Sequence, residues 1–84
     1  MPVLSRFYGI IIRMYFQQSE HNPPHIHASY GGATAEVDIK TGDVIEGQIP
    51  PKALSMVREW IEINRKDLMH MWKTQEFKAL SPLE

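Results

Sequence analysis

Residues 25–39 read HIHASYGGATAEVDI, and the alignment of the expected sheet depends on this segment. Its central Gly31-Gly32 dipeptide is typical of a two-residue β-hairpin loop, and apolar and polar residues alternate on both sides of it. A two-residue loop places Tyr30 opposite Ala33 and thereby sets the register of every earlier pair. We therefore predict an antiparallel hairpin in which each residue of 25–30 faces a residue of 33–38.

This register separates the side chains of the hairpin onto two faces, because neighbouring residues of a strand point in opposite directions. One face is wholly apolar. The other carries two facing imidazole–carboxylate pairs, His27 with Glu36 and His25 with Asp38. Directly opposed Cβ atoms lie roughly 4.5–5.5 Å apart, so the paired groups are near enough to hydrogen-bond or to share a metal.

Three of the four histidines fall within residues 21–27. A carboxylate beside an imidazole suits acid–base chemistry, because it orients a ring whose pKa lies near neutrality. The candidate catalytic residues are therefore the two strand histidines, the two carboxylates that orient them and one loop histidine at the rim: His25, His27, Glu36, Asp38 and His21.

Two other interpretations of this cluster stay open. It could be the solvated face of a hairpin, where cross-strand polar pairs contribute only roughly 0.2–1 kcal/mol each. It could also bind zinc, manganese or iron, which accept imidazole and carboxylate ligands, but an H-x-H spacing alone leads us to assign no metal and no other cofactor. The chain has no nucleophile elbow, P-loop or dinucleotide fingerprint, so an unassisted histidine mechanism is the simplest enzymatic option.

Upstream of the hairpin, Phe7–Phe16 is rich in aromatic and β-branched residues on both alternations. This pattern predicts one central strand that is covered on both faces. Its mixed face includes Arg13 and is expected to adjoin the histidines.

Downstream of the hairpin, residues 40–43 predict a second turn that leads into a strand within residues 44–49. A three-residue loop would place Ile45 opposite Ile39 on the core face. The same register would place Glu46 opposite Asp38.

A helix is predicted to follow Pro50-Pro51, because the missing N–H of proline costs nothing in a first turn. Apolar residues, including Trp60, recur at helical spacing through residues 53–72 and should cover the sheet. Asn64 lies inside this apolar stripe, where it must find a hydrogen-bond partner or divide the helix into two. The pattern then fades, and residues 76–84 are expected to form a tail.

These elements predict a single α+β domain over residues 1–84. A three- or four-stranded antiparallel meander within residues 3–49 precedes one long or two short helices within residues 50–75, packed on one face of the sheet. The 84 residues, 43% of them hydrophobic, should bury one modest core, and the absence of cysteine leaves a homo-oligomer or a partner protein as the means of adding to it. No secretory signal or membrane-spanning run is recognisable, so we expect a cytoplasmic protein without membrane contact.

The charge balance bears on the choice of partner. Nine basic and ten acidic residues give a formal net charge of −1. Nucleic-acid-binding proteins are usually basic, so this balance argues against nucleic-acid binding. A local basic patch could still form from four dispersed residues: Arg6, Arg13, Lys40 and Lys52.

Several segments together resemble a small bacterial domain family of unknown function that includes the DhiT-like proteins, proposed toxins of type II toxin–antitoxin pairs. The resemblance spans nearly the whole chain and is carried by Ser5–Ile12, the HNPPHIHA motif of His21–Ala28, Asp38–Gly42 with Gly47, and Trp60-Ile61. It implies a small antitoxin protein as partner and RNA as a candidate target, and it carries over no catalytic residue. We therefore expect a toxin-like component of such a module, acting as a histidine-dependent ribonuclease or other hydrolase. The alternative is a non-catalytic protein-interaction or metal-binding module.

Overall fold

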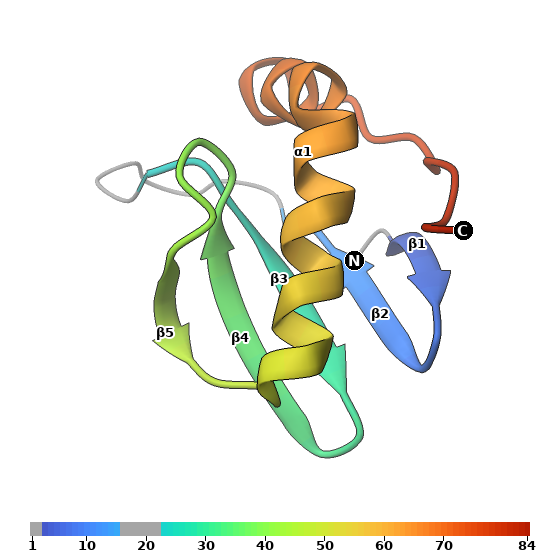
Figure 1. Cartoon of the computed structure of the whole chain (residues 1–84). Coiled ribbons are helices and arrows are strands. Elements are labelled where there is room, and N and C mark those ends of the chain that lie inside the picture. The colour runs from blue at the N-terminus through green and yellow to red at the C-terminus, as the bar shows by residue number, and fades with distance from the viewer. Residues whose placement is uncertain (1–2, 16–22) are drawn as a thin grey trace.

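A computed structural model describes residues 3–15 and 23–84 of the chain. Five strands form one antiparallel meander and precede a single helix (Figure 1). The elements are β1 (Val3–Phe7), β2 (Ile10–Arg13), β3 (His25–Tyr30), β4 (Ala33–Asp38), β5 (Val44–Gly47) and α1 (Pro51–Thr74). The predicted α+β class is confirmed, and the sheet has one strand more than the expected three or four.

The register of the central hairpin is as predicted. Tyr30 lies opposite Ala33, His27 opposite Glu36 and His25 opposite Asp38. Two physical features produce this agreement. The two-residue loop leaves little freedom in how the strands align, and a slip by one residue would move the apolar side chains of both strands out of the core.

The single strand expected over Phe7–Phe16 is wrong, because the chain reverses at Tyr8-Gly9 and forms the β1–β2 hairpin. Tyr8 and Gly9 have φ angles of 49° and 82°. Positive φ at both central residues is the geometry of a type I′ turn, whose twist suits a two-residue hairpin. Apolar residues occupy both alternate sets of positions in this run, so the pattern contains no break that marks the turn.

The predicted register of the second turn is also wrong. Glu46 lies opposite Glu36, not Asp38, and Val44 lies opposite Val37. The register shifts between these two pairs, so Ile45 is an extra, bulged residue with 40% of its surface exposed, rather than a core residue facing Ile39.

The helix α1 is continuous from Pro51 to Thr74 and begins at the two prolines, as expected. The Asn64 side chain donates a hydrogen bond of 3.0 Å to the carbonyl oxygen of Trp60, so this polar residue is satisfied without a gap in the helix. Figure 1 shows the axis changing direction between the yellow first turns and the orange last turns. Gln75, in the left-handed region with a φ of 62°, ends α1. No helix in the described ranges is long and apolar enough to cross a bilayer.

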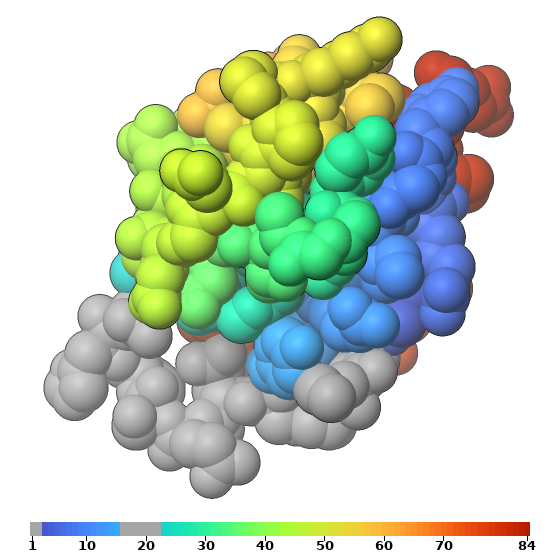
Figure 2. Space-filling view, turned by 90° about the horizontal axis from the view of Figure 1, so that it is seen from below, coloured from blue at the N-terminus to red at the C-terminus, as the bar shows by residue number. Residues whose placement is uncertain are grey.

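The core lies between α1 and one face of the sheet, and Figure 2 shows the start of α1 stacked on the strands at the end that carries the β3–β4 turn. Trp60 at its centre has no exposed surface, contacts the Phe7 ring at 6.0 Å between centroids and donates a 2.8 Å hydrogen bond to the carbonyl oxygen of Ser81. The segment after the helix, expected to be a tail, also pairs with β1, since the Leu80 amide donates to the Leu4 carbonyl oxygen. These contacts hold the C-terminal residues against the core.

Candidate functional site

The histidines of β3 lie on the face of the sheet opposite the core, here called the outer face. Their neighbours Ile26 and Ala28 are fully buried beneath α1. His27 is half-buried, whereas His25, at the end of the strand, is only 7% exposed. The ring of His27 is therefore more accessible to solvent than that of His25.

The ring of His25 is held in one orientation by the proline segment before it. Its Nδ1 lies 2.8 Å from the carbonyl oxygen of Pro23. A carbonyl oxygen only accepts hydrogen bonds, so Nδ1 carries the hydrogen and donates it. The other ring nitrogen, Nε2, then faces Glu36 Oε1 at 3.5 Å.

The ring of His27 lies between two other rings. It contacts Tyr15 edge-on at 4.4 Å between centroids, and it lies 5.1 Å from the ring of His25. Burial is the main cause that lowers the pKa of His27 below its ordinary value, because it disfavours the charged imidazolium. The carboxylate of Glu36 opposes this shift, and His25 adds to it.

The structure brings together three of the five predicted site residues. One ligand atom each from His25, His27 and Glu36 lies within 4.8 Å of the other two. Asp38 is not part of this cluster, although it faces His25 in the register. His21 lies outside the described residues.

Asp38 instead stabilises its own turn. Its Oδ1 accepts hydrogen bonds from the amides of Lys40 at 2.7 Å and Thr41 at 3.1 Å. A short carboxylate side chain commonly caps the backbone two and three residues ahead. The expected pairing of His25 with Asp38 is therefore replaced by a diagonal contact with Glu36.

The last turns of α1 support the site from the side. The Trp72 ring lies 5.1 Å from the ring of His25. Two arginines of α1 bind the β4–β5 connection, with Arg58 Nε donating to the Gly42 carbonyl oxygen at 2.7 Å and Arg65 Nε to that of Ile39 at 2.9 Å. These bonds hold the helix at the end of the sheet where His25 lies.

A row of polar residues crosses the outer face at the level of His27. Arg13 of β2 faces His27, which faces Glu36, which in turn faces Glu46 of β5. The register places Arg13 next to the cluster on one side and Glu46, an exposed residue, on the other. Of the other basic residues considered for a patch, Lys52 lies at the start of α1, away from this face.

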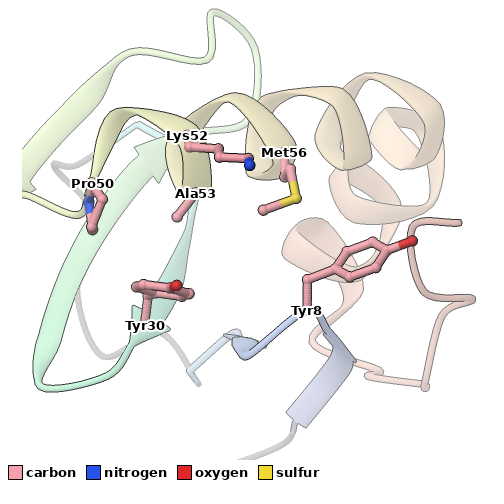
Figure 3. A pocket seen from close by; sticks show the side chains of 6 residues that line it. All are labelled: Tyr8, Tyr30, Pro50, Lys52, Ala53 and Met56. Carbon is pink, nitrogen blue, oxygen red and sulfur yellow. The ribbon is translucent and has the colours of Figure 1, made fainter.

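Sequence reasoning missed a groove between the two hairpin turns and the start of α1 (Figure 3). The side chains of Tyr8 and Tyr30, 61% and 38% exposed, lie below Lys52 and Met56 of α1. The groove was not predicted because the turn at Tyr8-Gly9, which forms one side of it, was not predicted. A glycine inside an apolar run about twice as long as an average strand was the signal that could have revealed it.

The two sites differ in chemistry. The groove is lined mainly by apolar and aromatic side chains, so it suits the binding of an apolar or aromatic group. The cluster of His25, His27 and Glu36 offers two imidazoles and a carboxylate that is about a quarter exposed and therefore reachable from solvent. These groups can accept a proton or coordinate a cation.

Comparison with known proteins assigns the chain to one family. No curated protein and no solved structure matches it. Residues 9–73, which include the three clustered site residues and most of α1, match the family described as Domain of unknown function (DUF4160), and the protein belongs to this family.

Proposed function

We propose that this protein is the toxin-like component of a bacterial type II toxin–antitoxin module and acts as a histidine-dependent hydrolase on RNA phosphodiesters. The observation that carries the proposal is the convergence of His25, His27 and Glu36 within 4.8 Å on the outer face. The resemblance of the HNPPHIHA motif to DhiT-like proteins supports the toxin role and a small antitoxin protein as partner. The proposal includes a cytoplasmic location, because RNA is available there.

The position of Arg13 supports a phosphodiester as substrate. It faces His27 across β2 and β3, and a guanidinium group binds phosphate oxygens through paired hydrogen bonds. A net charge of −1 does not prevent this, because an arginine in the strand next to the cluster would need to orient one phosphate rather than bind a whole duplex.

The proposed reaction is cleavage by an internal hydroxyl. The ribose 2′-oxygen attacks the adjacent phosphorus while the cluster accepts its proton. The bond from phosphorus to the 5′-oxygen breaks, and this oxygen takes up a proton as it leaves. The products of this step are a 2′,3′-cyclic phosphate and a free 5′-hydroxyl, and hydrolysis of the cyclic phosphate by water completes the reaction.

Growth on induced expression in a bacterial host tests the proposal with a pair of matched variants. Glu36→Gln removes the carboxylate of the cluster, and Glu46→Gln removes the same charge from the facing, exposed residue of β5. The first variant should abolish growth arrest and release of cyclic-phosphate RNA ends, whereas the second should retain both. Equal growth arrest by the two variants, with equal thermal stability, would contradict a role for the cluster.

A second candidate function, a non-catalytic interaction module, is favoured by the aromatic groove of Tyr8 and Tyr30. Its volume of about 430 Å³ is within the range of ligand-binding clefts. A protein that acts only by binding should lose its effect on growth through Tyr30→Ser and keep it in Glu36→Gln. This pattern is the reverse of that expected for the hydrolase.

A further inference from the structure

We infer that His25, His27 and Glu36 form a binding site for one divalent transition metal ion, with zinc as the best match. The inference rests on the same residues as the proposed function and deepens it. With the ion bound, the lone pairs of the three side chains would serve as ligands, and the ion rather than a free imidazole would activate the attacking hydroxyl. It depends on three observations: which nitrogen of His25 is free, how far apart the ligand atoms lie, and how the cluster is exposed.

The first observation is that two acceptors face each other. His25 donates its Nδ1–H to the Pro23 carbonyl oxygen, so in the neutral ring Nε2 presents a lone pair. That lone pair is directed toward a carboxylate oxygen of Glu36, which also only accepts. A cation between the two atoms turns this unfavourable contact into coordination. A backbone carbonyl that fixes the far nitrogen of a histidine is also the usual outer support of a metal ligand.

The second observation is the spacing. Zinc bonds to histidine nitrogen and carboxylate oxygen are about 2.0–2.2 Å long, which puts neighbouring ligands of a tetrahedral ion about 3.3–3.6 Å apart. The distance from His25 Nε2 to Glu36 Oε1 is 3.5 Å and already fits. No two of the three ligand atoms are more than 4.8 Å apart, and rotation of the two partly exposed side chains, His27 and Glu36, can bring them to bonding positions.

The third observation is the surroundings. His25 is buried and held between His27 and Trp72, so the site has one rigid ligand and two adjustable ones. Three protein ligands leave one position of a tetrahedral zinc ion for water or substrate, as in catalytic zinc sites. Arg13 faces His27 in the strand register, and its long cationic side chain suits an anionic ligand such as a phosphate ester.

The experiment is titration of the untagged, EDTA-treated full chain with zinc by calorimetry and with cobalt by visible absorption. One submicromolar zinc site is expected, together with the visible bands of four-coordinate cobalt. His27→Ala and Glu36→Gln should each weaken binding about tenfold or more. The control variants His70→Gln, at an exposed histidine of α1, and Glu46→Gln should bind as tightly as the wild type.

Binding that is weaker than micromolar, or that survives His27→Ala and Glu36→Gln, would overturn the inference. The first result would indicate that a proton rather than a metal ion joins His25 to Glu36. Because the readout is binding, the two proposals fail separately. If growth arrest requires Glu36 but no metal binds, the proposed hydrolase is retained and the metal site is rejected. If a metal binds but the protein has no effect on growth, the metal site is retained and the proposed hydrolase is rejected.

Discussion

Replacing Gly47 by alanine tests how closely β5 is packed against β4 where Gly47 pairs with Ala35. Gly47 has a φ of 76°, and a Cβ atom placed there would overlap the backbone carbonyl oxygen of Thr34 and lie 3.3 Å from the Cα atom of Ala35. A side chain could rotate away from such an overlap, but the backbone of β4 cannot. We therefore expect the added methyl group to push β5 away from β4 at this point.

The expected loss combines two effects. A left-handed backbone costs alanine about 1–2 kcal/mol, and an extra methyl group in a tightly packed position costs about 1–3 kcal/mol, so Gly47→Ala should lower the free energy of unfolding by about 2–5 kcal/mol. An 84-residue domain has a total stability of only about 4–13 kcal/mol, so this loss is a large fraction of the free energy that holds the fold together.

Urea-induced unfolding, followed by tryptophan fluorescence, measures this loss. Gly32→Ala is the matched control, because no atom lies within 4 Å of its added Cβ and its φ is outside the left-handed region. The control should change the free energy of unfolding by less than about 0.5 kcal/mol. If the two variants differ by less than about 0.5 kcal/mol, the overlap at Gly47 relaxes without cost and the reasoning is refuted.

Three further predictions concern stability. Trp60→Ala should lower the free energy of unfolding by about 3–5 kcal/mol in urea titrations. Trp60→Phe should cost less, because phenylalanine keeps most of the buried volume and loses only the hydrogen bond to Ser81, and equal losses in the two variants would contradict the importance of the buried volume. Asp38→Ala should cost about 1 kcal/mol through its turn while leaving zinc affinity unchanged, and a loss of zinc binding would return Asp38 to the site. In EDTA-treated protein, burial lowers the pKa of His27, so the unfolded chain binds more protons at this residue and the free energy of unfolding should fall as the pH drops below about 6.5. In urea titrations at a series of pH values, His27→Gln should flatten this dependence of stability on pH. An unchanged dependence would refute the lowered pKa of His27.

The amino-acid sequence by itself determined the features that depend on local geometry. The register of β3 and β4 followed from a two-residue loop and strict alternation, and it placed His27 opposite Glu36 correctly. The start of α1 followed from Pro50-Pro51, and the burial of Trp60 followed from the helical spacing of apolar residues. In each case, the controlling residues are close in the chain or repeat with one period.

Only the tertiary structure decided the features in which two local patterns compete or distant segments meet. Phe7–Phe16 is apolar on both alternations, so the reversal at Tyr8-Gly9 became visible only once β1 and β2 were packed. The Asp38 carboxylate could pair with His25 or accept hydrogen bonds within its own turn. It binds the amides of Lys40 and Thr41, because these are close in the chain and no distant segment has to be positioned first. The contact of Trp72 with His25 joins residues 47 positions apart, and it depends on the path of α1 across the end of the sheet, which no local pattern encodes.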